Sequence, residues 1–153
     1  MTTFLDTCVV ISLLDDAHRL HAWSVAEVNK CKANGPAVIC DIVYCEVSIG
    51  MKTREELDEA IDAWGIERIQ MPDDALFRAG RAFLQYRDVN KGTKPGVLPD
   101  FFVGATAEVH SAPLMTDDVA RFTTYFPAVS LIRPPNPPVA PPAAAPMAKA
   151  GGP

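Results

Sequence analysis

Four acidic residues occupy positions where carboxylates could act together. They are Asp6, Glu46, Asp100 and Asp118, each beside the end of an apolar run or the start of a helical pattern. Carboxylate oxygens are the ligands that hard divalent cations such as Mg²⁺ and Mn²⁺ prefer. If these four side chains meet in space, the chemistry they indicate is metal-assisted.

The spacing of the four acids predicts that they meet at one edge of a parallel sheet. Asp6 directly follows the apolar run 2–5, and Glu46 lies about one and a half turns into a helix that begins near residue 41, after the run 36–40. A helix over residues 100–110 descends ~16 Å, and an extended run over 112–116 climbs back ~16 Å, so Asp118 returns to the edge where Asp100 lies. Open α/β sheets bind their ligands at this edge.

Carboxylates brought together in this way need a positive charge between them. Two like charges 4 Å apart repel by roughly 4 kcal/mol at an effective dielectric constant near 20. We therefore expect a cation at this edge, and the all-oxygen donor set favours Mg²⁺ or Mn²⁺, held by carboxylates and water. The sequence leaves open whether one ion or two are bound.

Each acid taken alone also has an ordinary structural explanation. Asp100 follows Pro99 at a helix start and fits a helix N-cap, and Asp6 and Asp118 fit the ends of strands and turns. Glu46 is different, because it lies in the largely apolar segment 42–47, where buried acids are rare unless they are paired or bind metal. A further acidic group is interpreted as the solvated early turns of a helix; it comprises Glu55, Glu56, Asp58, Glu59 and Asp62.

Short apolar runs alternate with amphipathic segments along the chain. The runs cover residues 2–5, 36–40, 67–71, 112–116 and 129–132. The helical patterns cover residues 9–14, 22–33, 42–52, 54–64, 74–87 and 100–110. Thr53 with Glu56 forms a capping box at the start of the fourth helix. This alternation predicts an α/β fold with a parallel sheet and helices on both faces.

The composition of the 153-residue chain is that of one globular domain with an appendage. The balance of 14 basic and 19 acidic residues gives a net charge of −5, which excludes a uniformly basic nucleic-acid-binding surface. We place the domain at residues 1–133. Residues 134–153 are rich in proline and alanine, and we expect a disordered tail there.

Cysteine usage and hydropathy indicate the cellular compartment. The four cysteines form no Cys-x-x-Cys motif, so a structural zinc site is not expected. No apolar run approaches the ~18 residues that span a bilayer, and no secretory signal is recognised at the N-terminus. We expect a cytoplasmic protein with reduced thiols and no membrane association.

Four motifs together resemble those of the PIN domain, and most closely those of the VapC-type toxins of bacterial toxin–antitoxin systems. The resemblance covers residues 1 to about 133 and leaves out the tail. The motifs are Leu5-Asp6-Thr7, then Ile42-Val43-Tyr44-Cys45-Glu46-Val47, then Leu98-Pro99-Asp100-Phe101-Phe102-Val103-Gly104-Ala105, and Leu114-Met115-Thr116-Asp117-Asp118 followed by Phe122.

The resemblance implies a Mg²⁺- or Mn²⁺-dependent ribonuclease on a five-stranded parallel sheet of order 3-2-1-4-5. It also implies a homodimer that is neutralised by a VapB-like antitoxin. By motif, the acidic quartet of the family corresponds to Asp6, Glu46, Asp100 and Asp118, with Asp117 in a variable position, although the adjacent acids leave the register open. Thr7 and Thr116 match positions where a hydroxyl supports the acids, and Thr106 stands where many relatives have histidine.

The chemistry expected of such a quartet is metal-assisted hydrolysis of RNA phosphodiester bonds. Glu46 either binds the metal, directly or through water, or orients the attacking water, and the sequence does not separate these roles. Five basic residues precede Asp100 and form either a track for RNA phosphates or an ordinary charged surface; they are Arg78, Arg81, Arg87, Lys91 and Lys94.

Other functions explain the sequence less well. A phosphatase of the Asp-x-Asp type also places an acid after its first strand, but its second acid position here is Cys8. A phospho-receiver domain needs an acceptor aspartate after its third strand, where this chain has Met71 and Pro72. The main alternative is a PIN-like module that binds RNA or protein without cutting.

Overall fold

The computed structural model describes residues 1–90 and 98–135. The strands are β1 (Thr3–Leu5), β2 (Ala37–Cys40), β3 (Ile66–Ile69), β4 (Leu114–Met115) and β5 (Leu131–Ile132). The helices are α1 (Thr7–Leu14), α2 (His21–Lys32), α3 (Asp41–Ser48), α4 (Arg54–Ala63), α5 (Asp73–Asn90), α6 (Pro99–Val109) and α7 (Val119–Tyr125). Lys91, Lys94 and most of the predicted tail, residues 136–153, lie outside the described residues.

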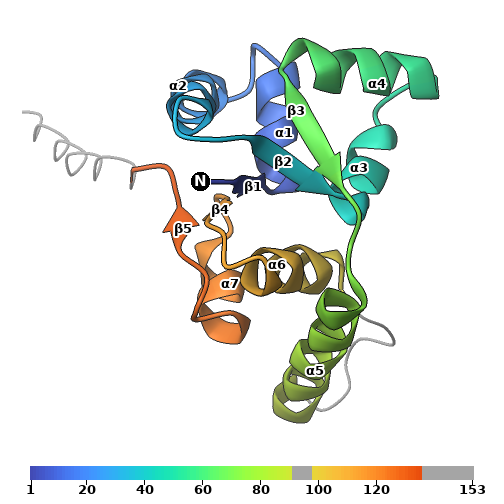
Figure 1. The fold of residues 1–153 in the computed structure, drawn as a ribbon, viewed down its shortest axis with the longest axis vertical. Helices are drawn as coiled ribbons and strands as arrows, with labels where there is room; N and C mark the ends of the chain where they lie inside the picture. The colour runs from blue at the N-terminus through green and yellow to red at the C-terminus, as the bar shows by residue number, and fades with distance from the viewer. Residues whose placement is uncertain (91–97, 136–153) are drawn as a thin grey trace, which may run out of the picture.

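The five strands form one sheet in the order β3-β2-β1-β4-β5, and every pair is parallel. This confirms the fold class and strand order. Figure 1 shows α1 to α4 on one side of the sheet and α5 to α7 on the other. The arrangement follows from right-handed crossovers, because the connections from β1 to β3 run toward one edge of the sheet and those from β3 through β4 to β5 run back.

The core lies on both faces of the central strands. Phe4 and Leu5 of β1, Ile39 of β2, and Leu114 and Met115 of β4 are fully buried. Strands buried on both faces read as continuous apolar runs, which is how the sequence pattern revealed them. Leu57 and Ile61 of α4 are likewise buried, and at the N-terminus of this helix the backbone N–H of Glu56 donates to the hydroxyl of Thr53 at 3.2 Å.

An aromatic cluster fixes α6 against the two helices beside it. Phe101 is fully buried, and the centre of its ring lies 5.7 Å from the ring centre of Tyr86 on α5 and 5.1 Å from that of Tyr125 on α7. Gly104 lets α6 approach the ring of Phe126 so closely that a Cβ has no room there. Asp100, one residue before Phe101, is therefore held on a well-packed helix.

Several element boundaries differ from the sequence prediction. Helix α1 begins at Thr7 because Asp6 caps it, two residues before the predicted start. Helix α3 ends at Ser48, short of the predicted residue 52. Helix α7 was not predicted at all, since its seven residues give too short a periodic pattern to detect.

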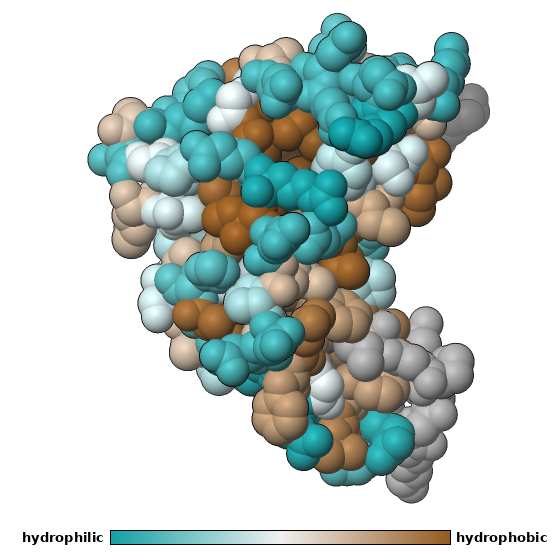
Figure 2. All heavy atoms as spheres, turned by 45° about the vertical axis from the view of Figure 1, so that its right-hand side comes forward, coloured by the Kyte–Doolittle hydropathy of each residue, from teal (hydrophilic) through white to brown (hydrophobic). Residues whose placement is uncertain are grey.

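None of the helices in the described part of the chain is long and apolar enough to cross a membrane. The face carrying α3, α4 and α5 is a mosaic of hydrophilic and hydrophobic residues in Figure 2. The exposed apolar side chains of the described residues include Ile49, Phe77 and Val89. All four cysteines, which lie within the described residues, are free thiols.

Candidate functional site

Asp6 is the most enclosed of the four predicted acids, with 5% of its surface exposed. It is the N-cap of α1, and its Oδ1 accepts a hydrogen bond of 2.8 Å from the backbone N–H of Thr7. Its Oδ2 accepts hydrogen bonds from the hydroxyl of Thr116, at 2.7 Å, and from the thiol of Cys8, at 3.5 Å. Because a buried carboxylate loses its hydration, the pKa of Asp6 is raised above its ordinary value, although these donors partly oppose the shift.

The register of two strands explains why Thr116 reaches Asp6. Leu5 of β1 is paired with Met115 of β4, so the next residues, Asp6 and Thr116, leave the same edge of the sheet side by side. The backbone N–H of Asp6 continues the ladder by donating to the carbonyl of Met115 at 3.0 Å. Two residues 110 positions apart in the sequence therefore face each other because of the strand pairing.

Glu46 joins Asp6 through Thr7. It lies on α3, which begins directly after β2 at the same sheet edge, and the hydroxyl of Thr7 donates to Glu46 Oε2. The negative charge of Glu46 also contributes to the raised pKa of Asp6, behind burial, so the two carboxylates are close enough to repel. The side chain of Glu46 is half-buried.

Asp100 and Asp118 meet through a basic residue. Asp100 is in the first turn of α6 and Asp118 is the N-cap of α7. The guanidinium of Arg121 forms an ion pair with Asp100 Oδ2, and its Nη1 lies 3.8 Å from Asp118 Oδ2. Arg121 thus holds together the two acids that the chain brings back to this edge.

Thr116 connects the two pairs of acids. Its hydroxyl donates to Asp6 Oδ2 and accepts a hydrogen bond of 3.0 Å from the backbone N–H of Asp118. Since Thr116 is fully buried, this two-sided contact fixes its hydroxyl. A continuous series of contacts therefore runs through all four acids, in the order Glu46, Thr7, Asp6, Thr116, Asp118, Arg121 and Asp100.

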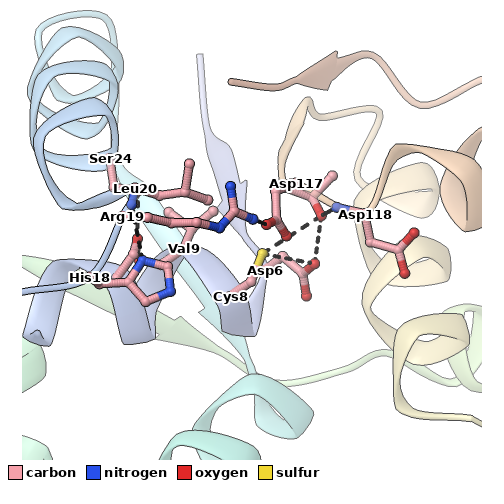
Figure 3. Close-up of polar contacts among 11 residues, drawn as sticks. Asp6, Cys8, Val9, His18, Arg19, Leu20, Ser24, Asp117 and Asp118 are labelled. Atoms are coloured by element: carbon pink, nitrogen blue, oxygen red, sulfur yellow. Dashed lines mark hydrogen bonds and ion pairs between the residues drawn. The ribbon is translucent and has the colours of Figure 1, made fainter. Parts of the chain in front are cut away.

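The adjacent acids Asp117 and Asp118 point in different directions. Asp117 forms an ion pair of 2.7 Å with Arg19, from the segment between α1 and α2, whereas Asp118 lies on the side of α6 and α7 (Figure 3). Cys8 sits between Asp6 and Asp117, and burial, followed by the charge of Asp6, raises the pKa of its thiol. The thiol stays protonated and acts here as a hydrogen-bond donor.

The donor chemistry fits a hard divalent cation, because all four acids offer carboxylate oxygens. The carboxylates are not gathered into a compact set of ligands, however. Within residues 1–90 and 98–135, no three His, Cys, Asp or Glu side chains are grouped closely enough to hold a metal ion. Two acids are bonded to hydroxyl groups and two to an arginine, so part of the positive charge expected at this edge comes from the protein itself.

Among the basic residues before Asp100, Arg78 makes structural contacts. Arg78 forms an ion pair with Glu108, donates to the carbonyl of Tyr125 at 2.7 Å, and lies 4.7 Å from the ring centre of Phe126. This residue ties α5 to α6 and α7, and it is occupied by structural contacts. From the sequence, Arg78 was a candidate either for an RNA-binding track or for an ordinary charged surface, because its partners are distant in the chain.

Arg121 is the residue of this site that the sequence analysis missed. Its spacing of i, i+3 from Asp118 was the available signal, but the spacing has meaning only if residues 119–125 are helical. Arg19 was also missed, since its partner Asp117 is 98 residues away.

A model of the PIN domain family matches residues 3–124. No curated protein matches the chain. Among solved structures, one match is a chain in the crystal structure of VapBC2 from Rickettsia felis bound to a promoter DNA fragment. The TM-score is 0.67 at 19% sequence identity, and the match covers 87% of this chain and 98% of that one.

Two further solved structures have similar folds. VapBC-1 from nontypeable Haemophilus influenzae matches with a TM-score of 0.62 at 18% identity, over 87% of this chain and 98% of that one. A toxin–antitoxin complex from Klebsiella pneumoniae matches with a TM-score of 0.56 at 25% identity, over 83% of this chain and 94% of that one. The likeness thus extends over almost the whole of each matched chain.

Proposed function

The chain belongs to the PIN domain family, and on that basis we propose that it is a metal-dependent endoribonuclease and the toxin of a VapBC-type pair. The observation that carries the proposal is the linkage of Asp6, Glu46, Asp100 and Asp118 at the carboxyl edge of the sheet. A surface acid on a solvated helix has no need of such supporting threonines, of which Thr116 is fully buried.

The protein's own groups prepare the site for phosphodiester hydrolysis. Three hydrogen bonds fix the Asp6 carboxylate, and Thr116 fixes Asp118 relative to it. Asp6, Asp100 and Asp118 are the proposed ligands of Mg²⁺ or Mn²⁺. Glu46, which accepts a hydrogen bond from the hydroxyl of Thr7, is proposed either to bind the metal, directly or through water, or to orient the attacking water. When bound, such an ion lowers the pKa of water and stabilises charge on the leaving 3′-oxygen.

Cleavage of RNA tests the proposal. Purified protein with Mg²⁺ or Mn²⁺ is expected to cut single-stranded or structured RNA, and chelation of the metal is expected to stop it. Asp6→Asn and Asp100→Asn are expected to abolish cleavage while retaining the circular dichroism spectrum of the fold. If the Asn variants cut as fast as the wild type, the activity comes from a contaminating nuclease.

The partner of the toxin is proposed to be a small VapB-like antitoxin. A hollow of about 440 Å³ beside the site offers both apolar and basic groups for such a segment. It is lined by Arg19, Leu20, Trp23, Asp117, Val119, Arg133, Pro134 and Pro135. Expression of the chain alone is expected to arrest growth, and co-expression of the gene next to it is expected to restore growth. Harmless expression without such a neighbour would refute the toxin assignment.

A homodimer in the cytoplasm completes the proposal. Phe77 and Val89 on α5 are 67% and 71% exposed, and burial of such side chains favours association. The free thiols agree with a reducing compartment. Light scattering of the wild type is expected to give a dimer mass, and a monomer mass at all concentrations would exclude it.

A PIN-like module that binds without cutting remains the second candidate. Two observations favour it: Arg121 forms an ion pair with Asp100, and the described residues contain no group of three side chains close enough to hold a metal ion. This candidate predicts no cleavage of any RNA and no binding of Mn²⁺ in a calorimetric titration.

A further inference from the structure

Arg121 stands in the part of the site where a metal ion would need both acids. Its guanidinium contacts Asp100 Oδ2 and lies 3.8 Å from Asp118 Oδ2, and these oxygens come from two separate helices. The Arg121 side chain is 39% exposed, compared with 23% for Asp100 and 45% for Asp118. The contact therefore lies at the solvent-facing side of the site, where an exchange with ions in solution is sterically open.

The position of Arg121 in its helix needs an explanation. It is the third residue of α7, and the N-terminal turn of a helix disfavours positive charge. The helix itself is anchored by Phe122, Tyr125 and Phe126, which are buried, so α7 does not depend on Arg121 for its packing. The two acids are what make a cation favourable at this place.

The other pair of acids is neutralised differently. Asp6 and Glu46 receive hydrogen bonds from hydroxyl, thiol and backbone N–H groups, and the described residues offer them no ion pair. One arginine also brings only a single positive charge to the whole quartet. A divalent ion bound by carboxylates from both pairs needs oxygens of Asp100 or Asp118, and the guanidinium pairs with Asp100 Oδ2 and lies 3.8 Å from Asp118 Oδ2.

We propose that Arg121 is an internal counterion that competes with the metal and thereby sets the metal affinity of the site. In the metal-free protein it keeps Asp100 and Asp118 together, and metal binding displaces it while α7 stays in place. Arg121 is thus a positioning residue that acts through the two acids. This inference rests on the metal site of the proposed function.

The test is a titration of the full chain with Mn²⁺, followed by isothermal calorimetry and by the electron paramagnetic resonance of free Mn²⁺. Arg121→Gln is expected to lower the Kd for Mn²⁺ by at least about tenfold, because it removes a positive charge beside a divalent ion. Arg121→Lys keeps the charge and is expected to restore a Kd close to that of the wild type.

Arg19→Gln is the matched control. Arg19 lies at the same side of the molecule as the site but pairs with Asp117 instead of the proposed ligands, so its removal is expected to change the Kd by less than about twofold at physiological salt. A second readout is the Nε–Hε resonance of Arg121 in the wild type. We expect it to shift on addition of Mg²⁺, with a midpoint that matches the Kd for Mg²⁺ from a parallel calorimetric titration with that ion.

The outcomes separate the inference from the proposed function. Equal Kd values for the wild type and both Arg121 variants would overturn the inference and leave the metal site intact. Weaker binding by Arg121→Gln would also overturn it, because Arg121 would then support the bound ion. No Mn²⁺ binding by any variant would overturn both the inference and the metal-dependent function.

Discussion

The two halves of the acidic site are built on opposite principles. Asp6 and Glu46 follow adjacent strands, and hydroxyl and backbone N–H groups fix them from within the fold. Asp100 and Asp118 stand at the starts of two helices, and a flexible arginine side chain joins them. One half is preorganised by hydrogen bonds, and the other is held by a charge that solvent ions can replace. Thr116, bonded to both halves, is the part that makes them a single site.

Substitution of the preorganised half is expected to have the largest effect. Asp6→Asn keeps the shape and removes the charge of the most buried acid, and we expect cleavage of RNA to slow by roughly 10³-fold or more, in line with the loss of a central electrostatic group. The measurement is the single-turnover rate at saturating Mn²⁺. Retention of more than a tenth of the rate would show that Asp6 is not at the centre of the chemistry.

Loss of the connecting hydroxyl is expected to have the next largest effect. Thr116→Val removes the acceptor of the Asp118 backbone N–H and leaves Asp6 Oδ2 with only the long contact from the Cys8 thiol. We therefore expect about a 10- to 100-fold loss of metal affinity. We also expect a loss of about 1–3 kcal/mol in the free energy of unfolding. Thr116→Ser, which keeps the hydroxyl, is the control for urea unfolding and Mn²⁺ titration. Equal results for the two variants would show that the halves are not coupled through this group.

The packing that supports the arginine-linked half can be tested at Gly104. A methyl group at this position clashes with the ring of Phe126, so Gly104→Ala is expected to destabilise the fold by about 1–3 kcal/mol. Gly80, on α5, has open space around it and is the matched position, where alanine is expected to be neutral or stabilising. Thermal unfolding of both variants gives the comparison, and equal destabilisation would refute the close approach.

A smaller effect is expected in the pH dependence of stability. The pKa of Asp6 is raised above 3.8 in the fold, so the native state binds this proton more tightly than the unfolded chain does. The stability that protonated Asp6 contributes is therefore present below pH 3.8 and is lost as the pH rises through the folded pKa. In the metal-free protein, Asp6→Asn is expected to gain stability relative to the wild type over this interval. A difference that does not vary with pH would contradict the effect of burial.

The half of the site that follows the strands could be predicted from the sequence more completely than the half at the helix starts. The apolar runs predicted the parallel sheet, because buried parallel strands have a continuous hydrophobic pattern. The order of the strands was predicted from the family resemblance. The residues after β1 and β4 could then be placed at one edge. Arg121 could not, because α7 is too short for periodicity to reveal and because ion pairs between separate helices leave no local signal. The same reason led Arg78 to be grouped with the RNA-binding candidates, although Glu108 and Phe126 engage it.

The central claim is that carboxylates from both halves of the site bind a divalent ion together. Anomalous diffraction from a crystal soaked in Mn²⁺ tests it most directly. The account predicts an anomalous peak bonded to Asp6 and to at least one of Asp100 and Asp118, with the Arg121 guanidinium displaced from Asp100. A peak absent from this edge at saturating Mn²⁺, with Arg121 still paired to Asp100, would contradict it.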